Sequence, residues 1–183
     1  MIQFIKTLKY NPVPKNGDHF TYLIKLTKHE IDPRSSSKST FYLNHDIILY
    51  SPMKRVTDTL IIKDNYIKMN ILKEIPFDLE KMSSKDQWQK HKSNIVREKF
   101  KDFFIKDKLL LPRKQIMKEI IQLLQLCDQY KSKRIAVISH SFRLKIIEAY
   151  IKTKGEIEKK PELIHYFIQN DKKTFDFGRG FKI

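Results

Sequence analysis

Two short apolar runs, one beginning at Ile47 and one at Ile135, predict β-strands at residues 46–50 and 135–139 that are buried on both faces. Uninterrupted runs of β-branched residues are typical of a parallel sheet that is covered by helices. A helical pattern follows each run directly, over residues 52–62 and over residues 142–153. The hydrophobic pattern therefore predicts strands that alternate with helices.

The remaining segments extend this alternation. The pattern predicts further elements at residues 2–6 (strand), 20–26 (edge strand), 27–44 (weak helix), 67–71 (strand), 85–104 (helix), 113–130 (helix), and 163–168 and 174–181 (one or two closing strands). Such an order predicts an α/β fold, a three-layer sandwich with a mainly parallel central sheet. The chain shows no internal repeat and no interdomain linker, so we expect a single domain over residues 1–183.

His140 is the first candidate for chemistry, because it follows the strand at 135–139 immediately. Open α/β folds bind their ligands at the carboxyl ends of such strands. The alternative is a histidine that only closes the end of a strand.

Arg55 is the second candidate. Ser51 is a helix N-cap candidate and Pro52 suits the first helical position, which places Arg55 in the first turns of the predicted helix. The amides at a helix N-terminus favour an anion, and an arginine can bind a phosphate through two parallel hydrogen bonds. The alternative is a capped surface helix that carries a solvated arginine.

Together these segments resemble the histidine phosphatase superfamily, which has the phosphoglycerate mutase-like fold. Three motifs carry the resemblance, in the order and at the spacing of the family: Ser51-Pro52-x-x-Arg55-x-x-x-Thr59, Leu72-Lys73-Glu74 and Ser139-His140. In the family, a histidine attacks phosphorus, arginines and a second histidine hold the phosphoryl oxygens, and a glutamate protonates the leaving alcohol. The resemblance thus implies that Arg55 and His140 bind phosphate and that Glu74 donates a proton. It also implies that residues 85–112 form a helical insertion over the site.

The Arg-His-Gly signature that carries the nucleophile has two candidate positions. Either Lys6-Thr7-Leu8 follows a strand at 2–5, or Lys28-His29-Glu30 follows a strand at 22–26. The second alignment leaves too few residues before Ser51 for a loop, a crossover helix and a strand. The first places Leu26-Thr27-x-x-Glu30 where the family opens a helix, and this is also a capping-box pattern. We therefore favour the first alignment.

In this alignment Thr7 takes the place of the nucleophile and Lys6 that of the first phosphate-binding arginine. Lysine keeps the charge but loses the bidentate fork, and a threonine without a base is a poor nucleophile. We expect a pseudoenzyme whose pocket, built from Lys6, Thr7, Arg55, Glu74 and His140, holds a phosphorylated small molecule or another anion. A protein partner is a further candidate. The first alternative is an active phosphomonoester hydrolase that uses His140 or another histidine, such as His29.

A basic nucleic-acid-binding module is the second alternative, because 37 basic residues against 21 acidic ones give a net charge of +16. Within 85–114, lysines and arginines alternate with Trp88, Phe100, Phe103 and Phe104. These aromatic residues fall near helical spacing, so we expect them in the core rather than stacked on bases, and we do not favour this alternative.

The other chemistry-bearing residues exclude several classes of protein. None of the six histidines lies at metal-ligand spacing from another, four glycines leave little room for a nucleotide loop, and we expect no metal and no cofactor. The single cysteine, Cys127, shares a helical face with apolar residues and is expected to be buried. A charge at Lys6 comes too early for a secretory core, and no apolar run approaches the about 20 residues that span a bilayer. We expect a cytoplasmic protein that does not bind membranes.

Overall fold

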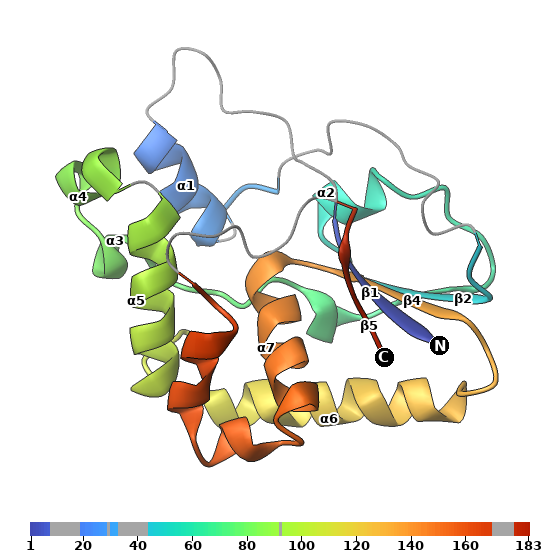
Figure 1. Cartoon of the computed structure of the whole chain (residues 1–183). Helices are drawn as coiled ribbons and strands as arrows, with labels where there is room; N and C mark the ends of the chain where they lie inside the picture. Colours follow the sequence, from blue (N-terminus) through green and yellow to red (C-terminus); the bar gives the residue numbers. More distant parts are fainter. Residues whose placement is uncertain (8–18, 29, 33–43, 92, 170–177) are drawn as a thin grey trace.

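A five-stranded sheet forms the centre of the computed structural model (Figure 1). The structure describes residues 1–7, 19–28, 30–32, 44–91, 93–169 and 178–183. The strands are β1 (Ile2–Lys6), β2 (Ile47–Tyr50), β3 (Tyr66–Lys68), β4 (Ile135–Ser139) and β5 (Gly180–Lys182), in the order β3-β2-β4-β1-β5. All neighbouring pairs are parallel except β1 and β5. The prediction of a mainly parallel α/β sheet is confirmed.

Helices lie on both faces of this sheet. In chain order they are α1 (His19–Thr27), α2 (Lys54–Thr57), η1 (Asn70–Leu72), α3 (Leu79–Met82), α4 (Lys85–His91), α5 (Ser93–Ile105), α6 (Arg113–Gln129), α7 (Ser141–Lys152), η2 (Glu156–Glu158) and η3 (Pro161–Tyr166). Figure 1 shows α6 and α7 on one side of the sheet and α2 on the other. The chain therefore has the expected three layers, although the layer that contains α2 is thin in the described part of the chain.

Strand alternation divides the hydrophobic core in two. Successive side chains of a strand point to opposite faces, so neighbours in sequence belong to different clusters. Phe4 and Val137 belong to the large cluster that contains α5, α6 and α7, whereas Ile5 and Ile138 pack with Val56 of α2 on the other face. Burial on both faces favours an apolar residue at every position, which is why β4 is apolar from Ile135 to Ile138, and the buried hydroxyl of its last residue, Ser139, donates to the Leu72 carbonyl.

Residues 20–26 form the helix α1, and the prediction of an edge strand there was wrong. Phe20, Leu23 and Ile24 follow helical spacing and pack against the large cluster. Thr27 ends this helix instead of capping the start of the next, and its hydroxyl donates to the Ile24 carbonyl at 3.0 Å. The helix expected within 27–44 is absent from residues 28 and 30–32, and residues 33–43 lie outside the described part.

The helix expected over 52–62 is also shorter than predicted. α2 has only four residues and its N-cap is Met53, so Ser51 and Pro52 lie outside it. The Thr59 hydroxyl donates to the Arg55 carbonyl at 2.8 Å, while the Thr59 amide donates to Val56. A side chain that takes a helical carbonyl competes with the backbone ladder, which accounts for the early end of the helix.

The C-terminal segment differs from the prediction as well. Residues 163–168 were expected to form a strand, but η3 covers most of them. Ile164 of η3 and Ile168, which follows it, are both fully buried in the large cluster, so this segment packs on the core. Of the strand expected over 174–181, the structure describes β5, and residues 170–177 lie outside the described part.

The aromatic residues of 85–114 face the core, as expected. Trp88, Phe100 and Phe104 are buried, on two helices, α4 and α5, instead of one continuous helix. That this segment forms an insertion over the site stays a prediction.

In the described part of the chain, no helix is both long enough and apolar enough to span a bilayer.

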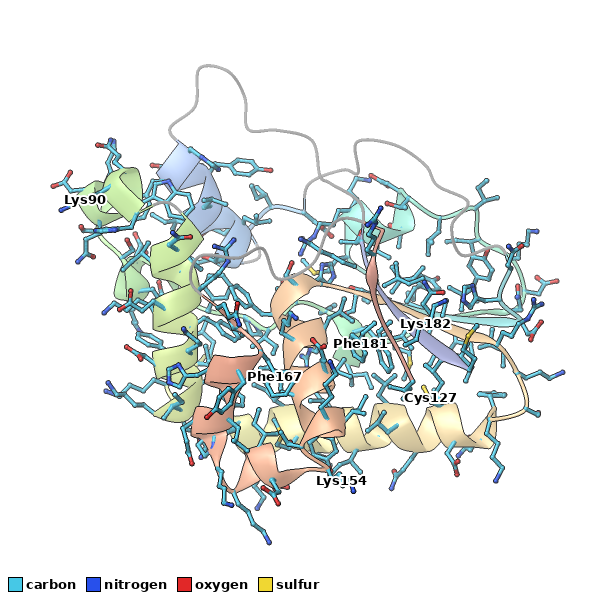
Figure 2. The ribbon with its side chains drawn as sticks, viewed as in Figure 1. Lys90, Cys127, Lys154, Phe167, Phe181 and Lys182 are labelled. Carbon is cyan, nitrogen blue, oxygen red and sulfur yellow. The ribbon has the colours of Figure 1, made fainter. Side chains whose placement is uncertain are left out.

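Cys127 lies on α6 and points toward the sheet (Figure 2). Its side chain is 1% exposed, and burial raises the pKa of the thiol to about 11. A thiol that stays protonated and covered is a packing residue, so the prediction of a buried structural cysteine is confirmed.

Gly180 gives a test of the pairing between β1 and β5. A Cβ at this position would collide with the Phe4 carbonyl group, because the Cβ would lie only 2.8 Å from the carbonyl carbon of Phe4. We therefore expect Gly180→Ala to force the two strands apart and to lower the free energy of unfolding by about 1–3 kcal/mol. Urea unfolding followed by circular dichroism measures this loss. Lys182→Ala, at an exposed position of the same strand, is the control, and equal effects of the two changes would contradict the packing argument.

Candidate functional site

The parallel pairing of three strands places Thr7, Ser51 and His140 at one edge of the sheet. β4 pairs with β1 and with β2, and these residues are the first to follow the three strands. The Thr7 amide donates to the Ser139 carbonyl at 2.9 Å, and the Ser51 amide donates to the Ile138 carbonyl at 3.0 Å. This carboxyl edge is where parallel sheets present polar groups to ligands.

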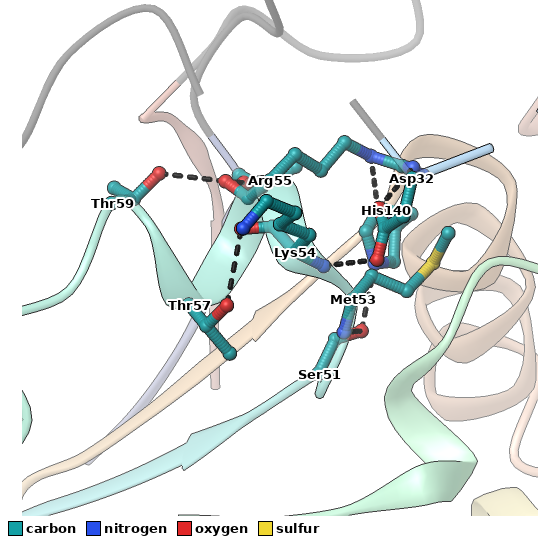
Figure 3. A network of polar contacts seen from close by, with 9 residues as sticks. Asp32, Ser51, Met53, Lys54, Arg55, Thr57, Thr59 and His140 are labelled. Atoms are coloured by element: carbon teal, nitrogen blue, oxygen red, sulfur yellow. Dashed lines mark hydrogen bonds and ion pairs between the residues drawn. The ribbon is translucent and has the colours of Figure 1, made fainter. Parts of the chain in front are cut away.

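Arg55 contacts His140 directly at this edge. Its Nε lies 3.1 Å from Nδ1 of His140, and both side chains are buried. Nε2 of His140 lies 2.9 Å from the Ser51 hydroxyl (Figure 3). Because a guanidinium only donates hydrogen bonds, Nδ1 must be the acceptor. Nε2 therefore carries the proton and donates to Ser51, so the imidazole is neutral in this arrangement.

Thr7 supports the backbone of Arg55. The Thr7 side chain is almost completely buried, and its hydroxyl donates to the Arg55 carbonyl at 3.2 Å. The Thr59 hydroxyl donates to the same oxygen. Both lone pairs of one carbonyl are thus engaged by hydroxyls from separate segments, which fixes the position of Arg55 at the sheet edge.

Asp32 is a member of the site that sequence reasoning missed. Its Oδ1 lies 3.9 Å from Nη1 of Arg55, and its Oδ2 accepts the backbone N–H of Lys54 (Figure 3). Asp32 lies in a short polar stretch beside Pro33 and belongs to none of the three motifs. No local pattern distinguishes it from other surface aspartates.

Glu74 binds the start of α7. Its carboxylate accepts the backbone N–H groups of Phe142 and Arg143, at 3.4 and 3.0 Å, and that of Ile75 at 3.1 Å. The first amides of a helix have no partner within the helix, so a carboxylate from another segment serves as their cap. Since His140 is the N-cap residue of α7, Glu74 also fixes the helix that carries the imidazole.

Arg143 of α7 links the segment that carries Glu74 to the helix α6. Its Nε donates to the Lys73 carbonyl at 3.0 Å, and its Nη1 pairs with Glu119 of α6 at 2.8 Å. Burial lowers the pKa of the Arg143 guanidinium, and the charge of Glu119 opposes this shift. A buried arginine that lost this partner would be strongly destabilising, so the three segments are held as a unit.

Lys6 is the last residue of β1, and its backbone pairs with the C-terminal segment. The Lys6 amide donates to the Arg179 carbonyl, and the Lys6 carbonyl accepts from Gly178, both at 2.9 Å. Strand alternation places Lys6 and Thr7 on opposite faces of the sheet.

The structure thus brings Thr7, Arg55 and His140 into one hydrogen-bonded group and places Glu74 at the start of the adjacent helix α7. Among the residues described, no cluster of three or more histidine, cysteine or acidic side chains suits a metal ion.

Comparison with known proteins finds matches among solved structures only. No family model and no curated protein matches the chain. The α-ribazole phosphatase from Shigella flexneri is 14% identical, with a TM-score of 0.48, over 87% of this chain and 83% of that one. The phosphoserine phosphatase from Entamoeba histolytica in complex with 3-phosphoglyceric acid is 18% identical, with a TM-score of 0.46, and the match covers 91% of this chain and 84% of that one. A mutant of the phosphoserine phosphatase from the same organism, in complex with phosphoserine, is also 18% identical, with a TM-score of 0.42. This match also covers 91% of this chain and 84% of that one. At these values the site has to be interpreted from its own geometry.

The capping contacts of Glu74 predict a structural effect. Glu74→Ala removes the acceptor of three amides, so we expect a loss of about 1–2 kcal/mol in the free energy of unfolding. Glu74→Gln keeps an acceptor oxygen and should lose less. Chemical denaturation measures both, with Glu98→Ala at an exposed position of α5 as the control. A fully stable Glu74→Ala protein would show that these contacts do not hold the helix.

The contact between Arg55 and His140 predicts a single tautomer. At neutral pH, ¹⁵N-detected NMR of the imidazole rings should show Nδ1 of His140 unprotonated and Nε2 protonated, because Nδ1 accepts from Arg55. His165, which is exposed, serves as an internal reference for the free tautomer mixture. A doubly protonated ring, or a proton on Nδ1, would contradict the arrangement.

Proposed function

We propose that this chain belongs to the histidine phosphatase superfamily and binds a phosphorylated small molecule, or a related anion, without phosphohistidine catalysis. The observation that carries the proposal is the buried contact of Arg55 with His140 at the carboxyl edge of a parallel sheet. The resemblance of the three sequence motifs supports it.

Arg55 has the properties of an anion-binding residue. Its side chain is 10% exposed, and attraction between charges is stronger in such a partly dry site than in water. A guanidinium offers several N–H donors in one plane, which match the oxygens of a phosphate. Contacts with His140, Thr7 and Thr59 hold the residue in place, so less conformational freedom is lost on binding.

The same contacts argue against turnover. The hydroxyl of Thr7 donates to a carbonyl, and both ring nitrogens of His140 have partners. Glu74 accepts three amides. A covalent mechanism needs an activated nucleophile, and removing one member of a catalytic unit commonly costs several orders of magnitude in rate. We therefore favour a pseudoenzyme that holds its ligand.

An active phosphomonoester hydrolase is the alternative. It requires His140 to release Arg55 or Ser51 before it can attack phosphorus, or another histidine to enter the site. His29, the other candidate, lies outside the described residues. The hydrolysis experiment below separates this alternative from the pseudoenzyme.

The other interactions expected from the sequence have less support. Stacking on nucleic-acid bases requires exposed aromatic rings, whereas Trp88, Phe100 and Phe104 are buried. The net charge of +16 equally favours the approach of a phosphorylated small molecule. A protein partner would have to present an anion to Arg55.

The single cysteine is buried, which suits a reducing compartment, and we propose that the protein acts in the cytoplasm.

Phosphate binding tests the proposal. Isothermal titration of the protein with inorganic phosphate at low salt should give a binding isotherm that Arg55→Ala abolishes. Arg55→Lys should bind at least about tenfold more weakly, because lysine keeps the charge and loses the fork. Arg134→Ala is the control, since Arg134 is exposed and pairs with Asp46 at the opposite end of β4. Equal binding by wild type and Arg55→Ala would exclude the proposed site.

Hydrolysis of p-nitrophenyl phosphate from pH 5 to 8 tests for turnover. The wild-type protein should release no more nitrophenol than buffer, and Thr7→His should gain slight activity if only the nucleophile is missing. Wild-type turnover that His140→Ala removes would establish the hydrolase and overturn the pseudoenzyme.

A further inference from the structure

The guanidinium of Arg55 faces an anion that belongs to the chain itself. The carboxylate of Asp32 lies with Oδ1 3.9 Å from Nη1 of Arg55, while Oδ2 accepts the backbone N–H of Lys54. Figure 3 shows Asp32 at the end of the Arg55 side chain. The two oxygens of one carboxylate therefore contact a guanidinium and a backbone amide at the same edge of the sheet.

These contacts are of the kind that a phosphate would make. Guanidinium groups and backbone amides are the common donors to phosphate oxygens, and a carboxylate offers two acceptor oxygens in a similar fork. A ligand that approaches Arg55 would meet the negative charge of Asp32 within a few ångströms. Two like charges at such a distance repel each other appreciably, even when they are partly exposed to water.

The hold of Arg55 on Asp32 is loose enough to be broken. The distance of 3.9 Å is beyond hydrogen-bond range, and the Asp32 side chain is 36% exposed, against 10% for Arg55. The pair joins a buried guanidinium to a half-exposed carboxylate without a hydrogen bond, so the closer, hydrogen-bonded contacts of a phosphate with Arg55 outweigh it. On leaving, Asp32 also gives up its hydrogen bond from the Lys54 amide. Residues 30–32 follow the end of α1 and belong to no helix or strand. Asp32 can thus move without breaking a helix or a strand.

We infer that Asp32 is an internal anion that sets the affinity of the site, and that a phosphorylated ligand binds Arg55 by displacing this carboxylate. The inference rests on the proposed function, since it assumes that Arg55 binds the ligand. Displacement makes the measured affinity weaker than the intrinsic affinity of the open site, in proportion to the fraction of molecules in which Asp32 has moved away. Asp32 thus determines the affinity and the specificity of the site for anions, because only an anion that binds Arg55 more strongly than the carboxylate of Asp32 does can occupy it.

Asp32→Asn isolates the charge. Asparagine has nearly the same shape and keeps an oxygen that accepts the Lys54 amide, but it does not compete for a guanidinium as an anion does. Asp58→Asn is the matched control. Asp58 follows α2 and pairs with Nζ of Lys54 at 3.6 Å, so the change removes one negative charge from the same region without removing a contact of Arg55.

Titration with inorganic phosphate compares wild type, Asp32→Asn, Asp58→Asn and the double variant Asp32→Asn/Arg55→Ala. We expect Asp32→Asn to bind phosphate at least about tenfold more tightly than wild type, since it removes a competing charge next to the ligand. Asp58→Asn should stay within about twofold of wild type, as a more distant and screened charge. The double variant should not bind, because the gain requires Arg55.

Two failures are distinguishable. If wild type binds phosphate through Arg55 but Asp32→Asn binds equally or more weakly, the inference is wrong and the proposed function stands. If neither wild type nor Asp32→Asn binds, the proposed function fails and the inference fails with it. Thermal unfolding of each variant verifies that it is folded. Should Asp32→Asn be unfolded, Asp32→Ser removes the same charge with a smaller side chain, and the same two comparisons decide.

Discussion

The parallel pairing of β4 with β1 on one side and β2 on the other is the constraint on which the site depends. In a parallel sheet all strands end at the same edge, so residues that follow different strands become neighbours whatever their distance in sequence. Arg55 and His140 are 85 positions apart, and their contact exists because β2 and β4 end together. Thr7 joins them because β1 ends on the other side of β4.

Arg55 is the residue that most of the site's contacts hold. Its Nε binds His140, its carbonyl accepts the hydroxyls of Thr7 and Thr59, and its Nη1 faces Asp32. Each contact restricts a long side chain that would otherwise move freely, and this ordering has been completed during folding. Such preorganisation favours binding of an anion. Thr7 and Glu74 are engaged as well, since the Thr7 hydroxyl donates to the Arg55 carbonyl and the Glu74 carboxylate accepts three backbone amides.

The carboxylates of the site illustrate how position decides the role of a residue. The motif that contains Glu74 suggests a proton donor, yet its carboxylate caps α7 and is tied to Arg143 and Glu119 through the same helix start. Asp32, which no motif contains, is the carboxylate that faces the guanidinium. Both are acidic residues in irregular segments, and only their surroundings distinguish them. Sequence reasoning thus identified Glu74 and missed Asp32, and the fold gives each carboxylate its contacts.

The sequence by itself determined the strands β1, β2 and β4 and the helices α6 and α7, because their apolar residues recur with the period of one element. It also indicated His140, which follows a buried strand directly, and Arg55, which lies at the start of the helix after another buried strand. The tertiary structure decided the extent of α1 and α2, the 3₁₀ conformation of η3 and the place of Asp32. In these segments the local pattern is ambiguous, and contacts with distant residues determine the outcome: the large cluster selects a helix for α1, and the Thr59 hydroxyl ends α2. A carboxylate in an irregular segment has no period that could be recognised in sequence, so its approach to Arg55 is fixed only when the chain folds.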